Sequence, residues 1–229
     1  MKKVFVLLAV VLITASMIAE NYPTKFLGIP VDGTKEEMIR NIQAKGFKLH
    51  KEYGQEFLSG EFNGQDVHVF VATNNNKVYR VMVAEQNRCS VGQIRIRFNN
   101  LMQQFKDNPK YVSYDINQTS IPAEEDISYE MIVHDKIYDA NFVQKSHELD
   151  TTLLHQDMEY ITKNLDQYLP TSVITEMESE VLVQYCLIQA FLKQYEKNMV
   201  WFRICDFQGE YYLTLYYDNL YNKANGEDL

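Results

Sequence analysis

The feature that most constrains the fold is a series of short alternating segments between residues 57 and 85, separated by turn sequences. Asn63-Gly64 and Asn74-Asn75-Asn76 are typical of tight turns between paired strands. Each segment places small or apolar residues on one face, in the groups Leu58, Gly60, Phe62; Val67, Val69, Val71; and Tyr79, Val81, Val83. Alternation with period two is the signature of strands with one buried face. The sequence therefore predicts an antiparallel meander over 57–85.

Helical patterns flank this meander on both sides. Thr34 and Glu37 have the spacing of a capping box, and Gly46 follows the helix that they would start. After the meander, apolar residues recur at helical spacing until Asn108-Pro109, although "QIRIR" alone also alternates like a strand. The residues of this second stripe are Ile94, Phe98, Leu101, Met102 and Phe105.

The stretch "FLGIPVDGT", Phe26 to Thr34, resembles a ligand-holding loop because it is rich in glycine and proline. We interpret it as a start signal for the first helix, since Pro30 favours extended chain and Asp32-Gly33 favours a turn. Its echo "SIPAEED" precedes a predicted strand and not a helix, so we treat the apparent repeat as coincidental.

The second half changes character twice. The segments 127–135 and 136–144 read as two strands with a turn near His134 to Lys136. Two apolar stripes at helical spacing then predict a helical hairpin, and the segments 199–207 and 210–218 predict two more strands. The two stripes are Leu154, Met158, Ile161, Leu165 and Val181, Tyr185, Ile188, Leu192, Tyr195.

These elements predict an α+β fold, with antiparallel sheet packed against helices and a helical hairpin inserted in the second half. The predicted organisation is an α-β-β-β-α half over 20–113 and a β-β-α-α-β-β half over 114–229. The length suits one compact domain or two tightly packed halves.

Residues 1–19 have the pattern of a signal peptide. Lys2 and Lys3 precede an apolar run from Val4 to Ile13, and the small residues Ser16 and Ala19 follow it. The run is short for a membrane span, and no later segment approaches that length. We expect an exported protein of the periplasm or cell envelope, without a transmembrane segment after signal removal.

Charge excludes one large class of partner. The chain carries 31 acidic and 22 basic residues, and loss of Lys2 and Lys3 would make it more acidic still. Nucleic-acid binding depends on neutralising phosphates with basic side chains. We therefore expect no nucleic-acid partner for this acidic, secreted chain.

The three cysteines allow one disulfide without requiring it. Cys186 and Cys205 both lie in apolar segments that could pack together in an oxidising compartment, while Cys89 is the third. The alternative is that all three are small buried hydrophobic residues.

Catalytic signatures are weak throughout the sequence. There is no phosphate-binding loop and no Gly-x-Ser-x-Gly motif, and the five histidines are scattered. We assign no catalytic residue, no metal ligand and no cofactor, although a site assembled from distant residues is compatible with the sequence.

The last predicted hairpin carries the best candidate for a binding surface. If Phe202, Ile204, Leu213 and Leu215 face the core, then aromatic rings and one guanidinium share the opposite face. The candidate ligand-binding residues are Trp201, Arg203, Tyr212 and Tyr216. The alternative is that they are ordinary packing residues.

The preferred hypothesis is an exported, non-catalytic binding or protein-interaction domain whose partner is an unknown envelope protein or glycan. One alternative is a cell-envelope hydrolase with a site built from dispersed histidines and carboxylates. Another is an envelope assembly or structural factor that uses the helical hairpin as a partner surface. Whether the chain is an enzyme stays open, with binding favoured.

Segments at both ends and in the middle also resemble a protein family. The segments "FLGIPVDGTKEEMIRNIQAKGF", "TNNNKVYRVMV", "IRFNNLMQQF", "IPAEEDISYEM" and "YYDNLYNKANGEDL" are similar to uncharacterised small secreted proteins of Bacteroides-like bacteria. The resemblance implies export and a compact α+β domain. It implies no activity and no residue roles, and it is weakest between Ser146 and Lys197.

Overall fold

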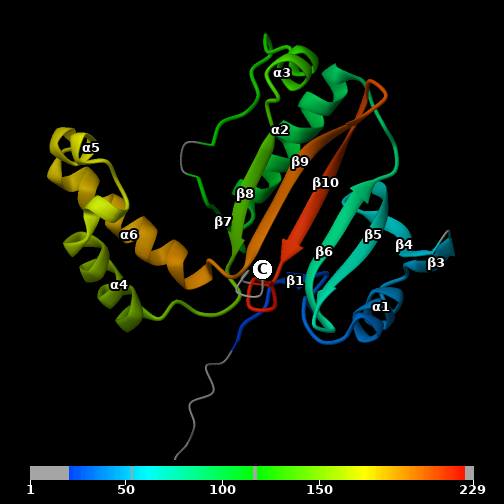
Figure 1. Ribbon diagram of the computed structural model, residues 1–229, viewed down its shortest axis with the longest axis horizontal. Helices are drawn as coiled ribbons and strands as arrows, with labels where there is room; N and C mark the ends of the chain where they lie inside the picture. The colour runs from blue at the N-terminus through cyan, green and yellow to red at the C-terminus, as the bar shows by residue number, and fades with distance from the viewer. Residues whose placement is uncertain (1–20, 53, 116–117, 225–229) are drawn as a thin grey trace, which may run out of the picture.

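A computed structural model describes residues 21–52, 54–115 and 118–224. An eight-stranded sheet dominates it, with the order β3-β4-β5-β6-β10-β9-β8-β7, and every neighbouring pair is antiparallel (Figure 1). Its strands are β3 (Lys48–Glu52), β4 (Gln55–Phe62), β5 (Gln65–Asn74), β6 (Lys77–Glu85), β7 (Tyr111–Ser113), β8 (Asp139–Gln144), β9 (Met199–Phe207) and β10 (Glu210–Asp218). Helices and antiparallel sheet confirm the predicted α+β fold.

The sheet is built from two units of the same design. α1 (Lys35–Gln43) precedes the strands β3 to β6, and α2 (Val91–Asp107) precedes the strands β7 to β10. The units meet where β6 pairs with β10, so the strand order of one mirrors that of the other. Each helix begins with a capping box, formed by Thr34 with Glu37 in α1 and by Ser90 with Gln93 in α2. The structural repeat therefore starts at Thr34 and at Ser90, and not at the "SIPAEED" echo.

Two insertions distinguish the second unit. The connection between β7 and β8 contains α3 (Ile127–Val133). The connection between β8 and β9 contains α4 (Thr151–Lys163), a 3-10 turn (Leu165–Gln167), α5 (Thr171–Glu176) and α6 (Ser179–Tyr195). α4 and α6 pack together as a hairpin that extends away from the sheet (Figure 1).

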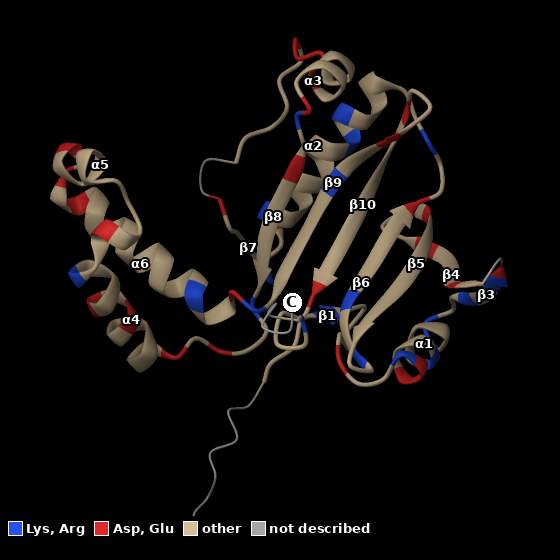
Figure 2. Ribbon diagram, in the orientation of Figure 1, with Lys and Arg blue, Asp and Glu red and all other residues tan. Residues whose placement is uncertain are grey.

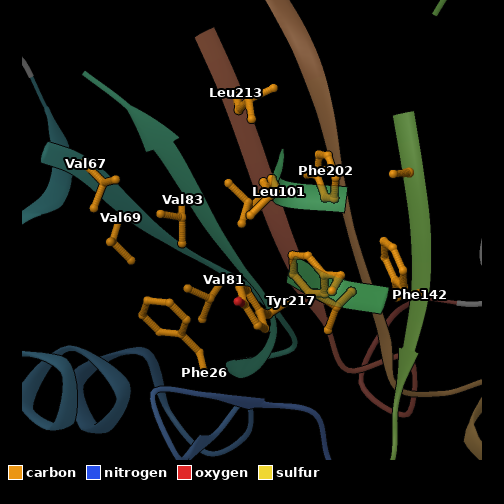
Figure 3. Packing of buried hydrophobic residues seen from close by; sticks show 14 of the residues in the cluster. Phe26, Val67, Val69, Val81, Val83, Leu101, Phe142, Phe202, Leu213 and Tyr217 are labelled. Carbon is orange, nitrogen blue, oxygen red and sulfur yellow. The ribbon is translucent and has the colours of Figure 1, made fainter. Parts of the chain in front are cut away.

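The main core lies between one face of the sheet and the helices α1 and α2. Met38 and Ile42 of α1 and Leu101 of α2 are buried in the same cluster as the inward residues of the strands. Figure 3 shows several of these, among them Val67, Val69, Val81, Val83, Phe142, Phe202, Leu213 and Tyr217. Each strand buries alternate residues there, so the period-two pattern in the sequence has its expected cause.

A small hairpin closes one end of this core. β1 (Lys25–Phe26) pairs with β2 (Ile29–Pro30), and Phe26 is fully buried against Phe62 and Tyr217. The sequence reading of this stretch as a turn leading into a capped helix is partly confirmed, because Thr34 caps α1. The β1–β2 hairpin itself was not predicted.

One predicted strand is wrong. Residues 127–133 form the helix α3, capped by Asp126, whose side chain accepts a hydrogen bond from the Tyr129 N–H at 3.0 Å. Ile127 and Met131, four residues apart, face the core, while Ile132 and Val133 are exposed. The segment is rich in apolar and β-branched residues, as strands are, but the residues that it buries are spaced as in a helix.

Candidate functional site

The face of the sheet opposite α1 and α2 is the largest candidate surface. Because strand side chains alternate, the residues between the core positions all point to this face. In the central strands most of them are half-buried, although Thr214 is buried. In Figure 1 the strands lie in front of α2 on this side. The residues of this open face include Phe57, Ser59, His68, Phe70, Arg80, Met82, Trp201, Arg203, Cys205, Tyr212, Thr214 and Tyr216.

An aromatic and ionic cluster occupies its centre, where the two units meet. Trp201 stacks on Tyr216 with ring centroids 3.9 Å apart and an interplanar angle of 13°. The Arg80 guanidinium lies 5.5 Å from the Trp201 ring and 5.0 Å from the Tyr216 ring. Arg80 also donates two hydrogen bonds of 2.6 Å to Asp218, which accepts a third from Trp201 Nε1 at 3.1 Å. The polar groups of this cluster satisfy one another, so it is a rigid base for the face.

Beside the cluster lies a cavity of about 480 Å³. That volume is within the range of small-molecule sites. Its apolar lining comes from the four strands β5, β6, β9 and β10, and Arg88 lies over the Phe207 ring, 4.1 Å from the centroid. The aromatic and apolar lining residues are His68, Phe70, Met82, Phe207, Tyr212 and Tyr216.

Two guanidinium groups on this face have no carboxylate partner among the described residues. Arg203 is half-buried on β9 between its cross-strand neighbours Thr214 and Asp139, makes no ion pair with Asp139, and has a buried Nε without a hydrogen-bond acceptor. Arg88 makes no ion pair among the described residues. Its guanidinium lies over the Phe207 ring.

The structure brings the four predicted ligand-binding residues onto one face. Trp201 and Tyr216 are cross-strand partners, Arg203 is two residues along β9, and Tyr212 lies in the cavity lining. Burial raises the pKa of both Tyr212 and Tyr216, so both hydroxyls are protonated at neutral pH. All four are half-buried, so each presents part of its side chain to the open face.

Sequence reasoning missed the contribution of the first unit to this surface. Arg80, Met82, His68 and Phe70 come from β5 and β6, more than a hundred residues before Trp201. Their alternation with the valines already placed them on one face of the meander. What the sequence lacked was the pairing of β6 with β10.

A histidine and a serine meet at the far edge of the same face. His50 Nε2 lies 2.7 Å from Ser59 Oγ, across the β3–β4 pair, and His50 Nδ1 lies 3.9 Å from Glu52 Oε1. Phe57 stacks on the His50 ring, and His68 is the cross-strand partner of Ser59. Burial lowers the pKa of His68, with a further contribution from His50. Ser59 and His50 are therefore placed as a nucleophile and a base, while the Glu52 carboxylate lies near the imidazole without a hydrogen bond to it.

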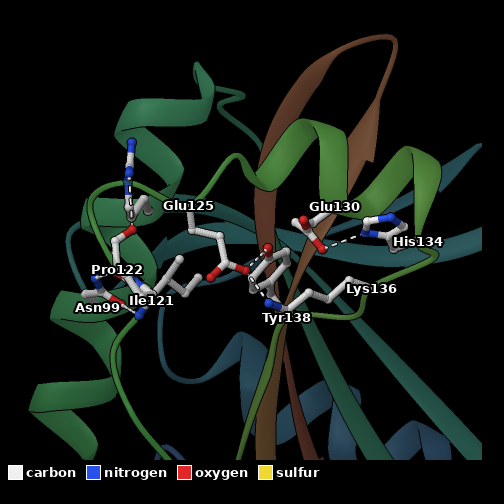
Figure 4. A network of polar contacts seen from close by, with 9 residues as sticks. Asn99, Ile121, Pro122, Glu125, Glu130, His134, Lys136 and Tyr138 are labelled. Carbon is white, nitrogen blue, oxygen red and sulfur yellow. Dashed lines mark hydrogen bonds and ion pairs between the residues drawn. The ribbon is translucent and has the colours of Figure 1, made fainter.

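His134 makes local contacts only, whereas His147 stacks on Tyr22 with ring centroids 4.6 Å apart. Figure 4 shows His134 of α3 beside Glu130, with Nδ1 2.9 Å from the carboxylate. In the same segment Glu125 binds Lys136 and Tyr138, and the Asn99 side chain holds the backbone of Ile121 with bonds of 2.9 and 3.0 Å (Figure 4). This network anchors the β7–β8 connection to α2. His134 is exposed, and these contacts explain the anchoring without any chemistry.

The three cysteines are free thiols, and Cys186 is not joined to Cys205. Cys186 is buried in the helical hairpin with Ile161 and Ala190, while Cys205 lies on the open face next to Thr214, 3.5 Å from its hydroxyl. Burial raises the pKa of the Cys89 thiol, which makes it a poor nucleophile.

The helical hairpin packs on the sheet only at one end. Leu192 and Tyr195 of α6 contact Val143 of β8, whereas Val183 and Leu187 of α6 are 54% and 43% exposed. An apolar strip of the hairpin is therefore open to solvent, as the assembly-factor hypothesis requires.

Comparisons with known proteins add no further assignment. The chain matches no protein-family model, and searches of curated proteins and of solved structures found no similar chain. Over the described ranges, no helix has the length and apolar character needed to cross a membrane, and no three potential metal ligands of the His, Cys, Asp and Glu types gather at one point. The predicted signal peptide lies outside the described residues.

Proposed function

We propose that this chain is an exported, non-catalytic binding domain that holds a carboxylate-bearing oligosaccharide on the open face of its sheet. The observation that carries the proposal is an aromatic cavity of about 480 Å³ with Arg88 in its lining and Arg203 next to the lining residue Thr214, the Arg203 Nε having no hydrogen-bond acceptor. Export is supported by the signal-like pattern of residues 1–19.

The chemistry of the cavity suits an acidic sugar. Aromatic ring faces carry negative partial charge, which attracts the weakly positive C–H groups on the flat side of a sugar ring. Guanidinium groups bind carboxylates with paired hydrogen bonds. A cavity of this size accommodates a few sugar units, whereas a stable protein interface covers about 800 Å² on each partner. We therefore favour the glycan over an envelope protein.

Calorimetric titration with oligogalacturonate, compared with the neutral galactose oligomer of equal length, tests this proposal. We expect the acidic oligomer to bind, and Arg203→Gln and Arg88→Gln each to weaken it at least tenfold. Arg40→Gln, on α1 and away from the open face, is the matched control and should bind as wild type. Trp201 is the only tryptophan, so its fluorescence should report occupancy independently.

Equal binding of the neutral oligomer, or unchanged binding by both arginine variants, would overturn the glycan proposal. Capture of one protein from an envelope extract, lost with Trp201→Ala/Tyr212→Ala, would overturn it in favour of a protein partner.

Ser59 and His50 support a second candidate function, an acyl hydrolase. At 2.7 Å, His50 could take the proton from Ser59 Oγ as the oxygen attacks a carbonyl carbon, with the Glu52 carboxylate near the imidazole. The backbone around Ser59 pairs with β3 on one side and with β5 on the other, so it has no N–H free to stabilise an oxyanion. In this proposal the donor to the developing oxyanion is His68, the cross-strand partner of Ser59.

A fluorophosphonate probe tests the hydrolase directly, because it labels activated serines. Labelling of wild type that is lost with Ser59→Ala and with His50→Gln, but retained with Ser120→Ala on an exposed loop, would support it. Absence of labelling, or labelling that survives Ser59→Ala, rejects it.

A further inference from the structure

A second concave region lies on the helix-bearing side of the sheet, away from the open face. It consists of two contiguous cavities of about 500 and 480 Å³, between the β1–β2 hairpin, the end of β4 and α2. The two share five lining residues, so they form one groove. The shared residues are Leu27, Phe62, Asn108, Tyr111 and Tyr217.

One end of the groove is apolar. Leu101 and Phe105 of α2 line it, opposite Phe62 of β4 and Leu27 of the hairpin. The Asn63 side chain donates a 2.9 Å hydrogen bond to Gln104 at this end, which joins β4 to α2. Glu61 is the acidic residue of this lining.

The backbone at Leu27 is held in an unfavourable conformation. Leu27 has φ 52° and Gly28 has φ 80°, so both central residues of the hairpin turn are left-handed. Glycine adopts this region freely, whereas leucine does so at a cost of about 1 kcal/mol. Asn or Gly is the usual residue there. The leucine places an apolar side chain over the groove, at a position where the turn alone favours a different residue.

The other end of the groove is basic. Lys25, Lys110 and Lys145 line it together. They meet because Lys145 N–H donates to the Lys110 carbonyl at 2.8 Å, while Gln144 holds the backbone of Lys25 through bonds of 2.6 and 3.0 Å. Across the described ranges none of the three lysines has a carboxylate within ion-pair distance, although the chain has nine more acidic than basic residues.

A hydroxyl donor lies between the two ends. Tyr111 accepts a hydrogen bond from Gln144 Nε2 at 3.3 Å, and its hydroxyl lies beside that of buried Tyr217. Tyr111 lines both cavities. Along its length the groove thus offers the apolar side chains of Leu27, Leu101 and Phe105, then the Tyr111 hydroxyl, then three cations.

We infer that this groove binds a long-chain carboxylate of the fatty-acid class. The carboxylate lies among Lys25, Lys110 and Lys145 and accepts the Tyr111 hydroxyl hydrogen bond, and the alkyl chain runs toward Leu27, Leu101 and Phe105. Glu61 at the far end disfavours the reversed orientation by charge repulsion. The site is independent of the open face and of the function proposed for it.

Calorimetric titration with dodecanoate and with its methyl ester tests the inference on the full chain. We expect dodecanoate to bind with one-to-one stoichiometry and at least tenfold more tightly than the ester. The combined change Lys25→Gln, Lys110→Gln and Lys145→Gln should remove that preference, while the matched control with Lys45, Lys48 and Lys77 changed to Gln should retain it. These control lysines are exposed and line neither cavity.

Leu27→Asn supplies a second variant that keeps the turn, because asparagine tolerates the left-handed conformation. It should weaken dodecanoate binding severalfold while circular dichroism and thermal unfolding show a folded protein. Equal affinity for acid and ester, or binding unaffected by both the lysine variant and Leu27→Asn, would overturn the inference. Binding lost in Leu27→Asn but unchanged in the lysine variant would also overturn it, since carboxylate recognition would then be absent.

Discussion

Arg80 and Asp218 face each other across the junction of β6 and β10, joined by two hydrogen bonds of 2.6 Å. Figure 2 shows basic and acidic positions meeting there, at the end of β10. The Asp218 side chain is only 4% exposed, and that of Arg80 25%. The pair therefore links the two units of the fold and also orients Trp201, which donates to the same carboxylate.

Asp218→Asn should lower the free energy of unfolding by about 3 kcal/mol, because it leaves a partly buried guanidinium without its counter-charge. Urea denaturation followed by circular dichroism measures this loss. The double variant Arg80→Leu/Asp218→Leu removes both charges and should lose less than Asp218→Asn alone. A loss in the double variant as large as that of Asp218→Asn, or larger, would contradict the idea that the unpaired charge causes the effect. Glu159→Gln, in an exposed pair with Lys163, is the control and should change stability by less than about 1 kcal/mol.

Gly60 makes a different kind of contact, with Phe47. A Cβ on Gly60 would lie 2.6 Å from the buried Phe47 ring, which covers the glycine on the core side of β4. Gly60→Ala should therefore destabilise the fold by about 1–3 kcal/mol through overpacking. Gly92→Ala is the matched control, since no atom lies within 4 Å of the added Cβ and the residue is in α2. Alanine should stabilise that helix by up to about 1 kcal/mol, so the two changes should have opposite signs in thermal unfolding.

The elements that sequence predicted well depend on local patterns. The meander over 57–85 and the final hairpin have regular alternation and turn residues, and α1 has a complete capping box. β7 is three residues long, too short to show a pattern, and α3 has β-branched residues on its exposed side. Pattern therefore fails where an element is short or where its exposed residues are apolar.

The candidate surfaces were only partly predictable for a related reason. The residues Trp201, Arg203, Tyr212 and Tyr216 belong to one hairpin, so alternation alone placed them on one face. Arg80 joins them through a strand pairing between residues more than a hundred positions apart, which no local pattern specifies. The groove near Leu27 likewise depends on the docking of the β1–β2 hairpin against Tyr111 and Gln144.

The two capping boxes predict that the two units respond alike to loss of a cap. Thr34 Oγ1 accepts from Glu37 N at 3.3 Å, and Ser90 Oγ accepts from Gln93 N at 3.5 Å. Thr34→Ala and Ser90→Ala should each cost about 1 kcal/mol in chemical unfolding. The double variant should show the sum, because the sites share no partner. Ser179→Ala, in the first turn of α6, removes no side-chain cap and should change stability by less than about 0.5 kcal/mol. A coupled or much larger loss in the double variant would show that the helices are not independent.

His68 of β5 and His147 in the connection between β8 and α4 predict a loss of stability at acid pH. Burial lowers the pKa of His68, and burial also lowers the pKa of His147, from an ordinary value of 6.5. A histidine whose pKa is lower in the folded state takes up its proton more readily in the unfolded chain. The stability that neutral His68 and His147 contribute is therefore full above about pH 6.5 and decreases as the pH falls below it. Urea unfolding of wild type and of His68→Phe from pH 8 to pH 5 measures the effect, since phenylalanine can keep the contact with Phe57, whose ring centroid is 4.6 Å away, but cannot be protonated. We expect the variant to gain stability relative to wild type as the pH falls through this window, whereas exposed His155→Gln should track wild type. A constant difference between His68→Phe and wild type across the range would show that His68 is not titrating in this way.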